Sequence, residues 1–342
     1  MTVPPCVVCI PAKDEAEAVP RLLAALAAQD VASPAAPLRV LLLANNCTDG
    51  TAAAARATAH PALALRVVDA QLRGIEAHVG FARRQALALG LDWLHQDRVP
   101  EGVLVSTDAD AVPPPEWIGA QLRALEAGAD CVGGRIALDE SIPLPPALLA
   151  VRDRVARYWA AVRGLADHLD PLPWDPAPRH GDHVAGSLAI RAGLYAAVGG
   201  LPPLPTGEDN ALVAAVERFG GRVRHAPEVF VRVSAREDGR AAGGMASEMV
   251  KWRRLGETGA PYLLPAAAFW QALLQRRAAL RQAFRQGILD EPLASLAAEC
   301  PNDIAFLARA EPLLPALPMS EAGIEDATAA LEALARPSSL AA

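Results

Sequence analysis

The sequence has 342 residues, of which 52% are hydrophobic and 21% are charged, so it has enough apolar material for a buried core and is not a disordered chain. Its formal net charge is −7, and its 32 basic residues are spread along the chain, which excludes the basic surface that binds nucleic acid. We therefore expect either one large domain with a smaller appendage or two domains, and no nucleic-acid partner.

The first half of the sequence alternates short apolar runs with amphipathic stretches. The predicted strands are 6–10, 39–43, 63–68 and 103–107, and the predicted helices are 15–29, 49–59 and 79–95. This alternation is typical of an α/β fold with a doubly wound, mostly parallel sheet flanked by helices. In such a fold, functional groups gather at the carboxyl ends of the strands.

The second half continues with shorter elements and then becomes helical. The predicted helices are 117–127, 146–165, 191–198 and 209–219, and the predicted strands are 131–137, 183–190 and one or two within 223–233. The Pro-rich stretch 170–180 reads as a loop and a candidate lid. From about residue 244 the sequence is rich in Ala, Leu and Arg, so we expect a first domain over 1–240 and a helical C-terminal region over 241–342.

The five cysteines and the first residues bear on the compartment. The cysteine count is odd, and no basic and then apolar leader precedes Lys13, so we expect a cytoplasmic protein with reduced thiols. The weakly polar stretch 260–274 is too short to span a bilayer, so we expect no transmembrane segment. Cys6 and Cys9 have the spacing of a metal or redox motif, but a strand would point them to opposite faces, and we interpret them as core.

Two carboxylates follow the predicted strand 103–107 directly. Asp108 and Asp110 are separated by one residue, and their oxygens suit a hard cation such as Mg²⁺ or Mn²⁺. A cation at the end of a strand can neutralise a diphosphate and stabilise it as a leaving group. Taken alone, an Asp pair of this spacing also fits a solvated turn.

Five segments in order along the chain resemble the GT-A glycosyltransferases of family 2. They are 8–15, 43–51, 80–84, 108–110 and 207–212. The resemblance spans about residues 5–240, and its strength lies in the set rather than in any one motif. It implies a GT-A-type fold and a metal-dependent, inverting, non-processive transfer of a sugar from a nucleotide diphosphate sugar, with Mg²⁺ or Mn²⁺ as cofactor. The acceptor would be a hydroxyl of a small molecule, a glycan or a lipid.

The resemblance also implies roles for individual residues. Asp110 would bind the metal directly, while Asp108 would touch the ribose or the water shell of the metal. Arg83 matches the basic position that the family uses beside the base and phosphates. The full set implied to contact the nucleotide sugar is Pro11, Ala12, Lys13, Glu15, Asn45, Asp49, Arg83 and Asp108. Asn45 stands where the family commonly has Asp; its amide oxygen can still accept a hydrogen bond, and the identity of the base stays open.

The acidic pair Glu208 and Asp209 supplies the candidate general base. A hydroxyl that attacks an anomeric carbon must lose its proton, and a carboxylate near an apolar helix start can have a raised pKa. Adjacent residues cannot both face one acceptor, and the resemblance favours Asp209 over Glu208. Both residues also fit as acidic side chains at a helix N-terminus, where the helix dipole favours them.

Four residues outside the five motifs are further candidates, each with a plainer alternative. Arg236 or Arg240 could clamp the diphosphate, or could belong to a surface loop of mixed charge. His225 could complete the metal site, or could be structural. Trp174 could stack on a sugar ring, or could anchor its loop.

Two other functions share parts of this pattern. A haloacid dehalogenase-like phosphohydrolase also has Asp-x-Asp after a strand, but at its first strand, whereas Asp108 follows the fourth predicted strand. A GT-A domain that binds a nucleotide without turnover is the non-enzymatic alternative. The composition of the C-terminal helices is compatible with shaping the acceptor site, with self-association into a homo-oligomer and with contact to a membrane surface, and it does not choose among them.

Overall fold

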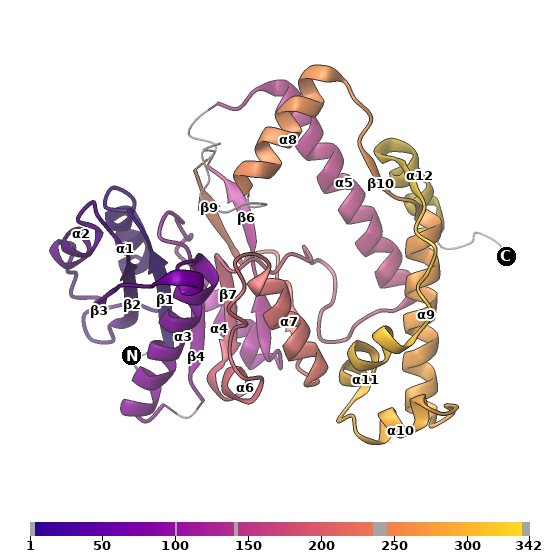
Figure 1. The fold of residues 1–342 in the computed structure, drawn as a ribbon, viewed down its shortest axis with the longest axis horizontal. Helices are drawn as coiled ribbons and strands as arrows, with labels where there is room; N and C mark the ends of the chain where they lie inside the picture. The colour runs from indigo at the N-terminus through magenta and orange to yellow at the C-terminus, as the bar shows by residue number, and fades with distance from the viewer. Residues whose placement is uncertain (1–3, 100, 140–142, 235–244, 337–342) are drawn as a thin grey trace. The chain divides into compact units, whose positions relative to one another are not determined.

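The computed structural model describes residues 4–99, 101–139, 143–234 and 245–336 (Figure 1). Contacts within the chain divide it into two compact units. The first comprises Met1–Asp139 and Pro178–Ser234, and the second comprises Glu140–Ala177 and Ala235–Ala342. The expected division at residue 240 placed the segment 140–177 in the first domain, whereas the contacts assign it to the second unit.

A seven-stranded sheet forms the centre of the first unit, in the order β3-β2-β1-β4-β7-β5-β8. Its strands are β1 (Cys6–Ala12), β2 (Leu38–Asn45), β3 (Leu63–Ala70), β4 (Val103–Thr107), β5 (Cys131–Gly133), β7 (Ser187–Arg191) and β8 (Val223–Arg224). Only β7 runs antiparallel to its neighbours among these strands, so the predicted doubly wound, mostly parallel α/β sheet is confirmed.

The predicted strand 131–137 is two strands in two sheets. After β5 the chain leaves the large sheet, and β6 (Arg135–Leu138) pairs with β9 (Phe230–Val233) in a separate parallel pair. The break falls at Gly134, where a Cβ atom would lie 2.0 Å from Oγ of Ser187. The backbone therefore passes β7 more closely than any side chain would allow, which the apolar pattern of the sequence does not reveal.

Strands β1 and β2 are buried along their whole length, as expected for parallel strands covered by helices on both faces. Cys6 and Cys9 of β1 are fully buried and are not in a disulfide. Burial raises the pKa of Cys6 to about 12, so this thiol is not a thiolate at neutral pH. The interpretation of the pair as core residues is confirmed.

The helices of the first unit are α1 (Val19–Ala27), α2 (Thr51–Ala57), α3 (Val79–Gln96), α4 (Trp117–Glu126), α6 (Ala192–Ala197) and α7 (Glu208–Arg218). Helix α1 begins at Val19 rather than near the predicted residue 15. The backbone N–H groups of Glu15 and Ala16 donate to the side chains of Thr51 and Asp49, so they belong to a loop instead of a helical turn. At Gly90 of α3 a Cβ atom would lie 2.4 Å from Sγ of Cys9, which shows how closely this helix packs on β1.

The second unit is mainly helical. Its elements are α5 (Pro146–Leu169), α8 (Met245–Thr258), α9 (Ala267–Gln286), α10 (Leu293–Ala298), α11 (Asp303–Ala310) and α12 (Ile324–Ala335), with a short sheet of β10 (Leu263–Pro265) and β11 (Glu321–Gly323). Helix α5 belongs here because its apolar face, with Tyr158 and Leu165, shares one core with Leu274 of α9 and Leu331 of α12. None of the helices in the described ranges combines the length and apolar character needed to cross a membrane.

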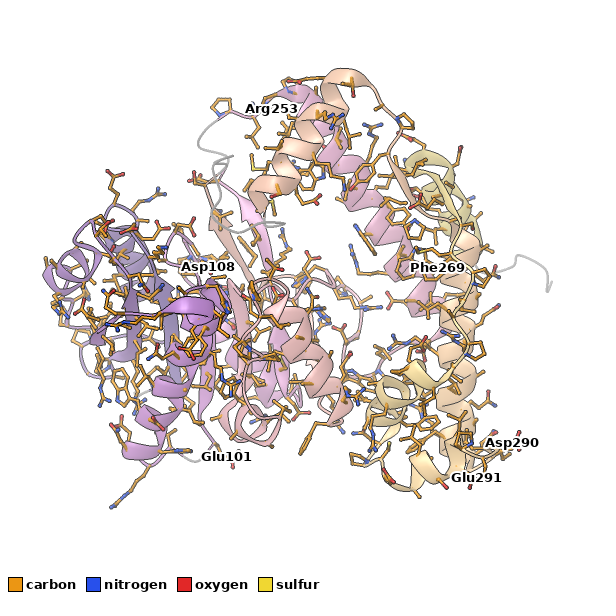
Figure 2. All side chains as sticks on the ribbon, viewed as in Figure 1. Glu101, Asp108, Arg253, Phe269, Asp290 and Glu291 are labelled. Carbon is orange, nitrogen blue, oxygen red and sulfur yellow. The ribbon has the colours of Figure 1, made fainter. Side chains whose placement is uncertain are left out.

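Aromatic rings extend this core. Phe269, labelled in Figure 2, packs edge to face on Trp270 with ring centroids 5.3 Å apart. The indole N–H of Trp270 donates to the hydroxyl of Tyr158, which donates in turn to the carbonyl of Pro265. These bonds satisfy the polar atoms that the core would otherwise bury unpaired.

A buried ion network anchors the loop that follows α5. Arg281 of α9 is 4% exposed and donates to both carboxylate oxygens of Asp170, at 2.8 and 3.1 Å, while its third nitrogen lies 3.1 Å from Asp303. The ring of Trp174 lies 5.4 Å from the same guanidinium. These contacts favour the alternative that Trp174 anchors its loop, and they hold this part of the expected lid against α9.

We expect Arg281→Leu to destabilise the second unit by about 3–5 kcal/mol, because it leaves buried carboxylates without their main counter-charge. Urea denaturation followed by circular dichroism measures the effect. Arg277→Leu, on the same helix, is the control and should cost much less. Equal midpoints for the two variants would show that the network contributes no net stability.

Candidate active site

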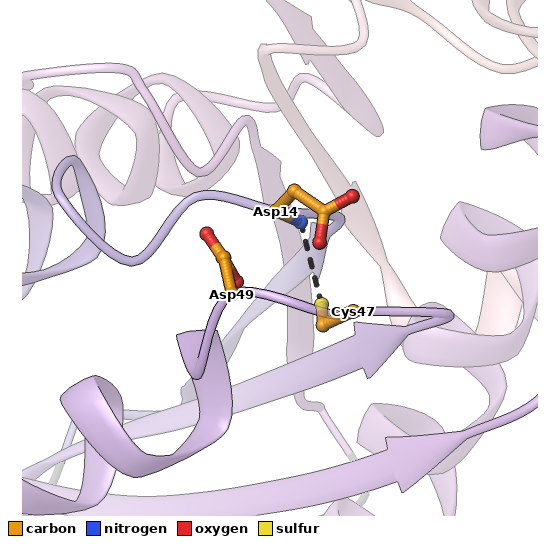
Figure 3. Close-up of side chains that lie close together, drawn as sticks. All are labelled: Asp14, Cys47 and Asp49. Atoms are coloured by element: carbon orange, nitrogen blue, oxygen red, sulfur yellow. Dashed lines mark hydrogen bonds between the residues drawn. The ribbon is translucent and has the colours of Figure 1, made fainter.

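Polar loops meet at the carboxyl ends of β1 and β2 (Figure 3). The carboxylate of Asp14 accepts a hydrogen bond from the backbone N–H of Thr48 at 2.6 Å and another from its hydroxyl at 3.2 Å. Asp14 and Asn46 have φ angles of 51° and 53°, in the left-handed region that Asp and Asn tolerate better than most residues. Asp14 therefore fastens the two loops to each other, and each loop turns sharply at a residue that tolerates this conformation.

Cys47 and Asp49 complete this fastening. The thiol of Cys47 donates to the carbonyl of Ala12 at 3.3 Å, and its sulfur accepts from the backbone N–H of Asp14 at 3.4 Å (Figure 3). Burial alone would raise the pKa of Asp49, but hydrogen bonds from Thr51 and from the backbone of Ala16 outweigh it and lower the pKa. The carboxylate of Asp49 is thus held ionised by the loops that it joins.

Asp14, Cys47 and Asp49 bring one ligand atom each to within 4.8 Å of one another, and in the described part of the chain no other group of three or more His, Cys, Asp or Glu residues does so. All three side chains already make the hydrogen bonds that close the loops. The cluster accordingly has a structural explanation without an ion.

The residues expected to contact the nucleoside lie along this edge. Pro11 and Ala12 are the buried end of β1, and Lys13 and Glu15 follow in the loop, with Lys13 exposed. Asn45 ends the neighbouring strand β2 and is 6% exposed. The sheet register, which pairs Ala12 with Ala44, places the first loop directly beside the second, as the sequence predicts for adjacent parallel strands.

Arg83 of α3 lies at the centre of the site and is 4% exposed. Its Nη2 donates to Oδ1 of Asp108 at 2.8 Å, and its Nε donates to Oε1 of Glu208 at 3.2 Å. Its Nη1 donates to the hydroxyl of Ser106 at 3.0 Å and to the carbonyl of Ala185 at 3.3 Å. One side chain therefore connects α3, the end of β4, the start of α7 and the segment before β7.

The charges around Arg83 decide its protonation. Burial alone would lower the pKa of its guanidinium, but the charges of Asp108 and Glu208 outweigh burial and raise that pKa above its ordinary value. The resemblance implied that Arg83 contacts the base and phosphates. In the structure its nitrogens donate to four protein acceptors, and the contact with base and phosphates stays a prediction.

Asp108, labelled in Figure 2, follows β4 directly, and its carboxylate lies against Gly186. Thr107 pairs with Ser187 of the antiparallel strand β7, so the next residues, Asp108 and Gly186, lie side by side. A Cβ atom on Gly186 would lie 2.5 Å from Oδ2 of Asp108. The position of this carboxylate thus depends on the absence of a side chain at residue 186.

The two adjacent carboxylates at the start of α7 point to different partners. Glu208 is 6% exposed and faces Arg83. Asp209 is half-buried, and its Oδ2 accepts from the backbone N–H of Ala185 at 3.0 Å. Ala185 therefore joins both halves of the site, since its N–H binds Asp209 and its carbonyl binds Arg83.

His225 lies in a histidine pair. Its Nε2 is 3.3 Å from Nδ1 of His183, and Nε2 of His183 is 3.0 Å from Oδ1 of Asn210 on α7. Burial, followed by the proximity of His225, lowers the pKa of His183. In the described part of the chain His225 forms no three-residue ligand group with Asp108 and Asp110. Arg236 and Arg240, the candidate phosphate clamp, lie outside the described residues.

Sequence reasoning missed Ser106, His183, Ala185 and Gly186. The sequence carried a signal for Gly186, because a glycine directly before a strand indicates that another group approaches the backbone closely. Ala185 acts through its main chain, so its residue type carries no information about its role.

The donor set at the end of β4 fits a hard divalent cation. Asp108 and Asp110 offer carboxylate oxygens, the side chain of Asp108 is 34% exposed, and Asp110 is half-buried. Mg²⁺ in proteins is commonly held by one or two carboxylates together with waters and substrate phosphates. Two carboxylates beside the edge where the residues expected to contact the nucleoside lie meet that requirement.

Residues 7–144 match the model of glycosyl transferase family 2. This segment belongs to that family. The matched segment contains β1 to β6 and four of the five motifs, including Arg83, Asp108 and Asp110. The resemblance predicted from the motifs is therefore confirmed over this segment.

Similar solved structures were also found. The mannosyltransferase PcManGT from Pyrobaculum calidifontis, in complex with GDP-Man and Mn²⁺, has 19% sequence identity and a TM-score of 0.48, with 98% of this chain and 87% of that chain covered. TarS of S. aureus in complex with UDP has 14% identity and a TM-score of 0.44, with 97% and 91% covered. No curated protein matched the chain.

A third structure is glucosyl-3-phosphoglycerate synthase from Mycobacterium tuberculosis in complex with Mg²⁺ and UDP. It has 15% identity and a TM-score of 0.41, with 76% of this chain and 83% of that chain covered.

We expect Gly186→Ala to displace the carboxylate of Asp108, because the added methyl group would lie 2.5 Å from Oδ2. Binding of Mn²⁺ in the presence of a nucleotide diphosphate should weaken by about tenfold or more, which corresponds to roughly 1.4 kcal/mol. Isothermal titration calorimetry measures it. Gly193→Ala, where a Cβ atom would meet no heavy atom within 4 Å, is the matched control. Unchanged binding in Gly186→Ala would show that Asp108 does not need this space.

The lowered pKa of Asp49 has a consequence for stability against pH. A carboxylate whose folded pKa lies below its unfolded value, about 3.9, stabilises the fold above that pH and stops doing so as the pH falls through the folded pKa. We expect Asp49→Asn to melt below the wild-type protein at pH 7 and to approach it as the pH falls below about 4. Thermal melts at several pH values test this, with Asp92→Asn on α3 as control. A constant difference between Asp49→Asn and the wild type would contradict it.

Proposed function

We propose that the protein is a metal-dependent, inverting and non-processive glycosyltransferase that uses a nucleotide diphosphate sugar. The observation that carries this proposal is the arrangement around Arg83. Arg83 donates to Asp108, a proposed metal ligand, and to the carbonyl of Ala185. The N–H of the same Ala185 donates to Asp209, the proposed base. The family of residues 7–144 supports the reaction class.

The loops after β1 and β2 are proposed to hold the nucleoside. Pro11 to Glu15 and Asn45 lie together on this edge, and the loops are fastened by Asp14 and Asp49. A fastened loop loses little conformational entropy when a ligand binds, which favours recognition of a flat base. Asn45 would use its amide oxygen as an acceptor, and its amide N–H groups as donors, towards base edges.

Asp108 and Asp110 are proposed to hold Mg²⁺ or Mn²⁺ together with the diphosphate. The cation would supply charge neutralisation for the departing nucleotide diphosphate. Two carboxylates leave several coordination positions for phosphate oxygens and water, which is the usual pattern for Mg²⁺.

Asp209 is proposed as the general base that removes the proton of the acceptor hydroxyl. It is half-buried rather than enclosed, and the N–H of Ala185 fixes its carboxylate. Glu208 is a poorer candidate, because it is buried and its carboxylate accepts from Arg83. With an acceptor hydroxyl on the face opposite the leaving group, a single displacement gives inversion at the anomeric carbon.

The two alternatives predicted from the sequence find less support. A phosphohydrolase would use Asp108 as a nucleophile, but one oxygen of this carboxylate accepts from Arg83 and the other lies beside Gly186. A domain without turnover would need no supported base, yet Asp209 is held by two backbone N–H groups, those of Ala185 and Asn210.

The decisive experiment titrates the protein with UDP, GDP and TDP and with their sugar conjugates, with and without Mn²⁺. We expect metal-dependent binding of one nucleotide, lost in Asp110→Ala and retained in Asp92→Ala. Asp209→Asn should keep donor binding and lower turnover by about 100-fold or more, since general-base catalysis contributes about that much.

Turnover is measured as release of the nucleotide diphosphate in the presence of candidate acceptors. Absence of nucleotide binding by folded wild-type protein would contradict the proposed donor site. Loss of donor binding in Asp209→Asn would contradict the proposed division between metal edge and base.

A further inference from the structure

Three ionised side chains form one group with an unequal charge count. Arg83 contributes one positive charge, and Asp108 and Glu208 contribute one negative charge each. The side chains of Arg83 and Glu208 are 5% and 8% exposed, while that of Asp108 is 34% exposed. The surplus negative charge therefore resides at the one carboxylate of the group that solvent reaches.

The buried part of the group has no direct role in the proposed chemistry. Glu208 is enclosed and bound to Arg83, so it faces neither an acceptor nor a donor phosphate. A buried ion pair is not by itself a strong source of stability, because its desolvation offsets most of the attraction. The location of the pair, next to a proposed metal ligand, gives it another use.

We propose that Glu208 is a positioning residue of the metal site: it neutralises Arg83, so that Asp108 keeps the negative charge with which it attracts a divalent cation. This inference rests on the proposed function, because it assumes that Asp108 and Asp110 hold the cation. It assigns to Glu208 a role through Arg83 and Asp108 rather than in proton transfer.

Arg83 and Glu208 have opposite effects on the charge beside Asp108. Arg83 is required to orient Asp108, since its Nη2 binds Oδ1 at 2.8 Å. Without Glu208, however, the guanidinium would cancel the charge of Asp108 and repel a cation nearby. Because the group is largely buried, water and salt screen these charges less than they would at the surface. Glu208 allows the protein to have the orienting hydrogen bond without losing the attraction.

The bond between Arg83 and Glu208 joins distant parts of the sequence. Glu208 begins α7, and the bond from Arg83 joins residues 125 positions apart. The next residue, Asp209, is the proposed base. Helix α7, which carries the proposed general base, therefore also sets the charge beside the proposed metal ligands.

The test measures Mn²⁺ affinity by electron paramagnetic resonance of the free ion, with UDP or GDP present at a fixed concentration. We expect Glu208→Gln to weaken Mn²⁺ binding by about tenfold, the size expected for loss of one nearby partly screened charge. Glu217→Gln, on the same helix and with the same change in net charge, should alter it by less than about twofold.

The double variant Arg83→Gln, Glu208→Gln separates charge from mere structure. It removes one positive and one negative charge, leaves Asp108 with its own charge, and buries no unpaired ion. We expect it to bind Mn²⁺ at least about threefold more tightly than Glu208→Gln, because the charge count at the site is restored, but more weakly than the wild type, because the bond that orients Asp108 is lost. If Glu208→Gln alone does not fold, Glu208→Asp keeps the charge beside Arg83 and should keep the Mn²⁺ affinity within about threefold of the wild type.

Two results would overturn the inference alone: wild-type Mn²⁺ affinity in folded Glu208→Gln, or no recovery in the double variant. Absence of Mn²⁺ binding by the wild-type protein would instead overturn the proposed function, and this inference with it. The two failures are distinguished by the wild-type titration.

Discussion

The organisation of the site depends on one buried guanidinium. Arg83 cannot be buried without acceptors, and its planar group fixes where those acceptors must stand. Asp108, Glu208, Ser106 and the carbonyl of Ala185 occupy these positions. A parallel sheet alone brings loops to one edge. The requirement to satisfy Arg83 sets the distances between them.

The elements and the reaction class could be predicted from the sequence because they depend on local patterns. The bounds of β4 were predicted to the residue and those of α3 to one residue, and the apolar runs 6–10 and 39–43 correctly predicted strands β1 and β2. The contacts of Arg83 could not be predicted, since its partner Glu208 lies 125 residues away and residue type does not report pairing. The place of 140–177 in the second unit was missed for a similar reason: helix α5 finds its core with residues beyond 260.

The loop after β2 departs from the family's motif. Asn45 stands where the family commonly has Asp, and the two residues after it, Asn46 and Cys47, each make bonds that the loop needs. Cys47 donates to Ala12, and Asn46 both donates to and accepts from the backbone of Leu72. These neutral groups hold the loop together with the carboxylates of Asp14 and Asp49. Fewer carboxylates at this edge mean less repulsion of the phosphates of a donor.

The main-chain junction at Ala185 has a consequence for how this site can vary among proteins. Its N–H and carbonyl serve Asp209 and Arg83 whatever side chain residue 185 carries, provided that it is not proline. Substitutions there leave no trace in composition. Insertions and deletions between His180 and Gly186 would shift which peptide group reaches each partner. The length of this segment is therefore constrained more tightly than the residue type at position 185.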